Sequence, residues 1–296
     1  MKKNLLAACA LTSVLSAAGT VLICDHVFGL FGRSSVSENV IFSKLPSKVL
    51  KEEREVIVHL PESYTREPER RFPVIYVLDG SSQDFHTAHS AALMARIGVM
   101  PEVIVVGLPN VSGAGRQRDY TPPFMAQDLD DPKSPRGAAD RFLAFLKTEL
   151  LPQIESAYRT APFRMLAGHS RGGLFVSYSL LADPQLFHAR FAHSPALWRG
   201  NALLVTKLTE LLNSSPQLEG FFYMSIGSEE NEKMKSAYLQ TRTALSQASV
   251  VGLRWHADLV AGADHNNNGE LATPLGFKVL YKDWPTPTGA ALARGR

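Results

Sequence analysis

Short apolar runs recur along the chain from residue 40 onward, separated by stretches rich in Gly, Pro, Asp and Ser. Runs of a few residues that alternate in polarity or stay fully apolar are typical of β-strands. Between the later runs, apolar residues recur at the spacing of an amphipathic helix. The pattern predicts strands at 40–42, 55–60, 74–78, 103–107, 164–167, 191–193, 221–226 and 253–259, and helices at 138–158, 174–181, 202–212 and 232–248.

Strand and helix alternate through the later part of the chain, which is typical of α/β proteins. Because a helix that connects two strands of one sheet usually leaves them parallel, we predict a mostly parallel, twisted sheet with helices on both faces. The first strands have shorter connections and are predicted to pair antiparallel at one edge. The chain of 296 residues accommodates one such domain, which we assign to residues 36–285. Residues 111–136 are predicted to be irregular and to border a ligand site, because they follow the end of a strand. Residues 286–296 are predicted to be a loose tail.

Residues 1–35 have the pattern of a targeting segment and a linker. A positive start with Lys2 and Lys3 precedes the apolar stretch Leu5–Leu15, and small residues follow at 16–18. This order predicts a secretory signal, so we expect an exported protein, periplasmic or secreted. Apolar residues resume shortly afterwards, and an uncleaved anchor that associates with a membrane is therefore the alternative.

Composition excludes some classes of partner. The formal net charge is +3, and Lys and Arg form no run or stripe, so a nucleic-acid partner is not expected. The two cysteines, Cys9 and Cys24, both lie in the N-terminal segment, so the folded domain does not depend on disulfides. The sequence carries no signal for an oligomeric state.

A G-x-S-x-G pentapeptide lies between a predicted strand and a predicted helix. It runs from Gly168 to Gly172, with Ser170 at its centre. In this setting the serine occupies a strained turn that holds its hydroxyl above the sheet, where it can attack a carbonyl carbon. Small residues are required on either side because the strand and helix backbones pass closely. Ser170 is therefore the candidate nucleophile.

A serine hydroxyl needs a base to accept its proton and an acid to orient that base. On this fold the chain order is serine, acid, histidine. Four histidines follow the serine: His256 lies inside a predicted strand, and His188 and His193 precede any acid-bearing loop. His265 lies in a polar loop after the last predicted strand, and it is the candidate base.

The acid is expected after the preceding strand, which ends in Gly227-Ser228-Glu229-Glu230. Glu230 is the candidate, because the fourth residue of this turn can point across the strand ends. Glu229 can serve with a one-residue change in the turn, and Asp264 is a third alternative. For the oxyanion, the expected donors are the N–H groups of Arg171 and of Ser81, which lies in a sharp turn after the strand at 74–78.

Two patterns resemble metal sites. Asp264 begins a stretch like a calcium loop, but the twelfth position, which must supply a carboxylate, is Leu275. His86 and His89 have a spacing compatible with zinc, but no third ligand accompanies them. We therefore expect no metal site and no cofactor.

Several segments, taken in order, resemble the esterase D-like group of α/β-hydrolases, which includes the enterobactin esterases. These segments are 73–80, 105–107, 116–122 (R-x-R-D-Y-T-P), 141–146, 168–173, 194–198 (S-P-x-L-W) and 227–230. The resemblance implies an α/β-hydrolase fold, a triad of Ser170, His265 and Glu230, and positions for Arg118 and Trp198 near the pocket for the acyl group or ring. Members often carry a short His-Gly or His-Ser segment after the base, whereas this chain has Asn at 266–268, so its pocket lip differs.

Together, the residues and the resemblance predict a serine carboxylic-ester hydrolase that acts through an acyl-enzyme. The expected substrate is a small molecule, a siderophore-type or other small or aryl ester. The alternatives are a feruloyl or acetyl carbohydrate esterase, an acyltransferase, and a catalytically silent binding protein of the same fold.

Overall fold

Every predicted strand is present in the computed structural model, which describes residues 39–125 and 134–282. The strands form one eight-stranded sheet in the order β1-β2-β4-β3-β5-β6-β7-β8. β2 runs antiparallel to β4, and each neighbouring pair from β4 through β3 and β5 to β8 is parallel, which confirms the predicted sheet. The bounds are β1 (Val40–Ser47), β2 (Glu52–His59), β3 (Phe72–Leu78), β4 (Ile104–Leu108), β5 (Thr160–His169), β6 (Ala189–His193), β7 (Gln217–Gly227) and β8 (Val251–Val260).

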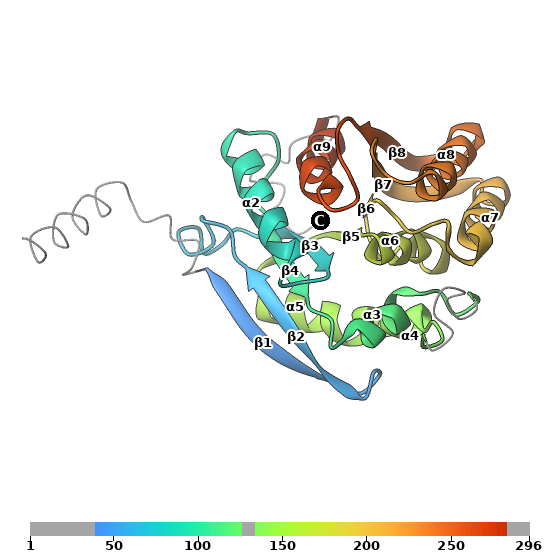
Figure 1. Cartoon of the computed structure of the whole chain (residues 1–296). Helices are drawn as coiled ribbons and strands as arrows, with labels where there is room; N and C mark the ends of the chain where they lie inside the picture. Colours follow the sequence, from blue (N-terminus) through green and yellow to red (C-terminus); the bar gives the residue numbers. More distant parts are fainter. Residues whose placement is uncertain (1–38, 126–133, 283–296) are drawn as a thin grey trace, which may run out of the picture. The chain divides into compact units, whose positions relative to one another are not determined.

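Helices cover both faces of the sheet, which is why its central strands are apolar without a break (Figure 1). α2 and α9 pack side by side on one face, over Ile75 and Val77 of β3. The remaining helices pack on the other face, over Val74, Tyr76 and Leu78. The bounds are α2 (Gln83–Arg96), α3 (Gly113–Tyr120), α4 (Ala139–Phe145), η1 (Leu146–Leu150), α5 (Leu151–Ala157), α6 (Arg171–Ala182), α7 (Arg199–Ser214), α8 (Glu232–Gln247) and α9 (Asn268–Lys282).

The helices differ from the sequence prediction at several places. The predicted helix 138–158 is α4 and α5 joined by a π-helical turn, η1. The stretch 111–136, predicted to be irregular, contains α3, whose buried residues are Gly115, Asp119 and Tyr120. α3 has no apolar stripe, so periodicity could not reveal it. α2 and α9 were also not predicted.

Residues 41–125 and 134–282 form one compact unit. The predicted leader, residues 1–35, and the predicted tail, residues 286–296, lie outside the described residues. Within residues 39–125 and 134–282, no helix is long and apolar enough to span a membrane. The parallel strands β3, β5, β6, β7 and β8 end at the same edge of the sheet, and the loops at this edge carry the candidate site.

Candidate active site

Ser170 occupies a sharp turn between β5 and α6, with φ 58° and ψ −115°. A non-glycine residue adopts this conformation only where its surroundings hold it. Its N–H donates to the His193 carbonyl at 2.9 Å, and its carbonyl accepts from the N–H of Leu174 at 3.0 Å. A Cβ atom at Gly168 would lie 2.6 Å from the carbonyl carbon of Gly172, so the two glycines allow strand and helix to approach.

Ser170, His265 and Glu230 lie together although they are far apart in sequence. His265 Nε2 is 3.0 Å from Ser170 Oγ, and His265 Nδ1 is 3.0 Å from Glu230 Oε2. The arrangement suits a neutral imidazole whose Nδ1–H donates to the carboxylate and whose Nε2 accepts from the hydroxyl. Such an imidazole can take the serine proton, and the carboxylate can stabilise the imidazolium that results.

The Glu230 carboxylate is fully buried. Burial by itself raises the pKa of Glu230, but hydrogen bonds from His265, from the Ser194 hydroxyl and from the Gly227 N–H outweigh it, and the pKa is lowered. Glu230 is therefore an anion at neutral pH. This is the protonation state that an acid supporting a base requires.

The two alternative acids have other contacts. Glu229 is exposed and accepts a hydrogen bond from the Ser228 hydroxyl at 3.0 Å. Asp264 accepts from the N–H groups of Asn266, at 2.8 Å, and Asn267, at 3.1 Å, so its carboxylate closes the turn that carries the histidine. Neither carboxylate takes part in the contact to His265 Nδ1.

A second polar layer, which sequence reasoning missed, lies behind Glu230. The Asn268 amide, at the start of α9, donates to Ser194 Oγ at 2.8 Å and to Ser225 Oγ at 3.0 Å. Ser225 Oγ also lies 3.0 Å from His193 Nδ1. Burial lowers the pKa of His193 to about 3, so its ring is neutral. The sequence signals for this layer were Ser194, the first residue of the S-P-x-L-W segment, and Asn268, the last of the three Asn residues after His265.

His169, the residue before the serine, was also missed. Its ring centroid lies 4.7 Å from that of His265. Burial, together with the neighbouring His265 ring, lowers the pKa of His169 to about 4. A neutral ring therefore packs against the candidate base and limits its movement.

The turn between β3 and α2 carries Ser81, the second predicted oxyanion donor. Asp79 and Ser81 both have positive φ, at 56° and 71°. Between them, Gly80 passes so close to the end of β4 that a Cβ atom would lie 2.5 Å from the Leu108 nitrogen. The Asp79 carboxylate lies beside Gly172, where a Cβ atom would be 3.2 Å from Oδ2. The turn with Ser81 thus packs against the helix that begins at Arg171.

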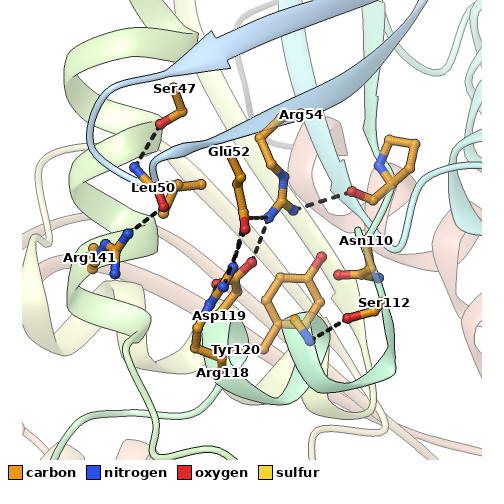
Figure 2. A network of polar contacts seen from close by, with 12 residues as sticks. Ser47, Leu50, Glu52, Arg54, Asn110, Ser112, Arg118, Asp119, Tyr120 and Arg141 are labelled. Carbon is orange, nitrogen blue, oxygen red and sulfur yellow. Dashed lines mark hydrogen bonds and ion pairs between the residues drawn. The ribbon is translucent and has the colours of Figure 1, made fainter.

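Arg118 binds residues outside the triad and the turn with Ser81. Its guanidinium donates to Glu52 of β2 at 2.7 Å and to Asp119 at 2.7 Å, within the polar network shown in Figure 2. Arg54 completes the network from the sheet side, with its guanidinium 2.6 Å from Asp119. The contacts of Arg118 join α3 to β2, and its predicted place near a substrate pocket remains a prediction from resemblance.

Trp198 lies at the N-terminus of α7, a few residues after Ser194. The Arg199 guanidinium lies 4.7 Å from its ring centroid and the Lys233 ammonium 5.9 Å. These distances are within the range of cation–π contacts. The segment therefore presents an aromatic ring together with positive charge near the turn that holds Glu230.

The histidines of the rejected metal pattern have local partners. His86 Nε2 is 3.1 Å from the Gln83 side-chain oxygen, and His89 Nδ1 is 2.8 Å from the Phe85 carbonyl. His256, inside β8, lies 2.9 Å from an Asp258 oxygen. In the part of the chain that the structure describes, no three His, Cys, Asp or Glu side chains are grouped so as to hold a metal ion.

Comparison with known proteins agrees with this geometry. The model of the Esterase family, described as "Putative esterase", matches residues 47–269. The ferri-bacillibactin esterase BesA of Bacillus subtilis is 31% identical over 169 residues, which are 53% of this chain and 58% of that protein. The siderophore enterobactin esterase of Emericella nidulans is 30% identical over 180 residues, covering 53% of this chain and 57% of that protein. The chain thus spans less than two thirds of the length of these two relatives.

A solved structure agrees as well. The IroE-like serine hydrolase from Shewanella oneidensis superposes with a TM-score of 0.75 and is 31% identical, covering 82% of this chain and 80% of the other. It shares the arrangement of sheet and helices, which confirms the predicted α/β-hydrolase fold. The chain therefore belongs to the Esterase family.

Proposed function

We propose that this protein is a serine carboxylic-ester hydrolase that works through an acyl-enzyme, with Ser170 as nucleophile, His265 as base and Glu230 as acid. The observation that carries the proposal is the position of the His265 ring, whose two nitrogens lie 3.0 Å from Ser170 Oγ and 3.0 Å from a buried Glu230 oxygen. Membership of the Esterase family supports the same chemistry.

In the first half of the reaction, Ser170 Oγ forms a bond to the ester carbonyl carbon while its proton passes to His265 Nε2. The carbonyl π electrons move to oxygen, which becomes an oxyanion. When the tetrahedral intermediate collapses, the bond to the alcohol oxygen breaks, and that oxygen takes the proton from His265. The products are an alcohol and an acyl-Ser170 ester.

In the second half, water replaces the alcohol. His265 removes a proton from the water, whose oxygen bonds to the acyl carbon, and returns that proton to Ser170 Oγ as the acid leaves. In both halves, the N–H groups of Arg171 and Ser81 are proposed to donate to the oxyanion. Donors fixed in advance stabilise this charge without reorganising during the reaction.

The proposed substrate is a siderophore-type or other small aryl ester. Two relatives carry names of siderophore esterases. In this chain, the ring of Trp198 with Arg199 and Lys233 beside it suits an anionic aromatic acyl group, because the ring can stack and the cations offset the charge. A panel of catecholate, feruloyl, acetyl-sugar and short alkyl esters, with and without an added alcohol acceptor, ranks this class against the carbohydrate-esterase and acyltransferase alternatives.

The N-terminal segment is proposed to direct export. Its order of positive, apolar and small residues over 1–18 supports this. Fusing residues 1–35 to a reporter enzyme that is active only outside the cytoplasm tests it. Reporter activity equal to that of a fusion without residues 1–35 would contradict export.

The direct test of the reaction is Ser170→Ala. Its turnover of a p-nitrophenyl ester should fall at least about 10³-fold, because the nucleophile is lost while the fold is kept. Ser246→Ala, which removes a hydroxyl on the exposed side of α8, is the matched control and should stay within about twofold of wild type. Retained turnover by Ser170→Ala would overturn the proposal.

A further inference from the structure

We infer that Arg116 and Asp79 form a positioning pair that holds the turn with Ser81 against the strand-to-helix turn of Ser170. The inference rests on the proposed function, because it assigns the pair to the geometry of the oxyanion site. It gives a positioning role to Arg116, the first residue of the R-x-R-D-Y-T-P segment, two residues before Arg118.

The Arg116 guanidinium bridges the two turns that carry the proposed donors. Its Nε donates to Asp79 Oδ1 at 2.6 Å, and its Nη2 donates to Asp79 Oδ2 at 2.8 Å. The same Nη2 donates to the carbonyl of His169 at 3.3 Å. One side chain therefore connects the turn after β3, which contains Ser81, to the residue directly before Ser170.

Asp79 has two further contacts, to Asn110 and to Tyr120. The Asn110 amide donates to its Oδ1 at 2.5 Å. Its backbone N–H donates to the Tyr120 hydroxyl at 3.2 Å, and the Arg116 guanidinium lies 5.7 Å from the Tyr120 ring centroid. A non-glycine residue at φ 56° is strained and persists only where its contacts outweigh the strain. These contacts therefore fix the backbone of the turn as well as its side chain.

The helix that carries Arg116 is itself anchored to the sheet. Successive residues of a helix are rotated by about 100°, so Arg116 and Arg118 project from different sides of α3. Arg118 and Asp119 contact Glu52 and Arg54 of β2 in the network of Figure 2. Arg54 and Asp119 are almost completely buried, so this side of α3 is fixed. Arg116 reaches the two turns from a rigid support.

Bidentate geometry is what a positioning role requires. A planar guanidinium with two parallel hydrogen bonds fixes both the distance and the orientation of a carboxylate, whereas a lysine ammonium fixes neither. Small errors in the position of an oxyanion donor lower the rate strongly without weakening the binding of the ground-state ester. Loss of the pair should therefore lower kcat and leave KM nearly unchanged.

The test compares wild type with Arg116→Ala, Arg116→Lys and Asp79→Asn in ester hydrolysis. We expect kcat to fall about 10- to 100-fold with KM within about twofold of wild type. Millimolar guanidinium should restore part of the kcat of Arg116→Ala and none of that of Asp79→Asn. The control is Arg164→Lys on β5, which breaks the bidentate pair of Arg164 with Glu155 of α5 and should leave both constants unchanged.

A trifluoromethyl ketone separates positioning from a general structural effect. Ser170 Oγ adds to its carbonyl carbon, the proton passes to His265, and the carbonyl oxygen becomes an oxyanion. The inhibition constant for this ketone should rise in proportion to the fall in kcat, whereas that of the product acid should not change. If Arg116→Ala does not fold, the same kcat and inhibition constants are measured for Arg116→Lys and for Tyr120→Phe. The second variant removes the hydroxyl that accepts from the Asp79 N–H.

The outcomes distinguish this inference from the proposed function. Wild-type protein without esterase activity, or Ser170→Ala with full activity, would overturn the proposed function. Active wild type with folded Arg116 and Asp79 variants of equal kcat would overturn the inference alone. A raised KM with unchanged kcat would also overturn it, because that result assigns Arg116 to substrate binding.

Discussion

Two carboxylates, each just after a parallel strand, are held in different ways. Asp79, after β3, faces the permanent charge of Arg116 in a bidentate pair. Glu230, after β7, faces an imidazole and two neutral donors, the Ser194 hydroxyl and the Gly227 N–H. Arginine does not titrate in the accessible range, whereas the charge of an imidazole appears when it accepts a proton.

The difference separates a fixed contact from a responsive one. The Asp79 pair has the same charges before and during the reaction, so its contribution is geometric. The Glu230 pair changes during the reaction, because the carboxylate stabilises the imidazolium that forms when His265 takes the serine proton. Removing charge from Glu230 should therefore have a larger effect on rate than removing it from Asp79.

The largest expected effect comes from Glu230→Gln. The amide cannot stabilise the imidazolium and favours the wrong tautomer of His265, so kcat should fall about 10³- to 10⁴-fold. Steady-state kinetics of p-nitrophenyl ester hydrolysis measure this. Glu229→Gln, on the exposed neighbour, is the control and should stay within about twofold. A greater loss in Glu229→Gln than in Glu230→Gln would reverse the assignment of the acid.

A smaller effect is expected from the polar layer behind Glu230. Asn268→Asp places a second carboxyl beside Ser194, which binds Glu230, and like charges raise a carboxyl pKa. The acid limb of the pH–rate profile, where Glu230 takes up a proton, should move to higher pH by about one pH unit. Asn266→Asp, at an exposed position in the same turn, is the control and should leave the limb in place. If the acid limb of Asn268→Asp stays where it is in wild type, the result would contradict an effect of this polar layer on Glu230.

The smallest expected effect concerns stability against pH. The pKa of buried His193 is lowered to about 3, so the unfolded chain binds a proton below the ordinary value of 6.5 that the folded chain does not. Stability contributed by this group is therefore complete above pH 6.5 and is lost as the pH falls toward 3, by up to about 1.4 kcal/mol per pH unit. Urea unfolding of wild type and His193→Gln between pH 7 and 4 measures it. Equal pH slopes in the two proteins would contradict the prediction.

The strands could be predicted because they are buried on both faces and therefore apolar without a break, as in β3. α2 was missed because its buried positions include Asp84 and Thr87, so large apolar residues do not recur at helical spacing. α3 was missed because ion pairs of Arg118 and Asp119, rather than an apolar stripe, hold it to the sheet. Periodicity reveals helices that pack through hydrophobic faces and misses those held by polar contacts.

The residues of the candidate site also fall into two groups, those that the sequence singles out and those whose role only the contacts reveal. Ser170 could be singled out because the strand, the glycines and the helix around it are typical of one kind of turn, which exposes a serine hydroxyl. His265 could be singled out because few histidines follow Ser170 in the sequence. Ser194 and Asn268 belong to residue types that are common in loops, so only their contacts reveal that they support Glu230. The resemblance pointed to Arg118, and the contacts of Arg116 with Asp79 and His169 are revealed only by the structure.

The most direct test of the account is mass spectrometry of the protein after reaction with a fluorophosphonate. The account predicts one adduct per chain, on the peptide that contains Ser170, formed at a rate that falls sharply in His265→Ala because the serine loses its base. No adduct, or an adduct on another residue while Ser170 stays unmodified, would contradict the claim that Ser170 is the activated nucleophile.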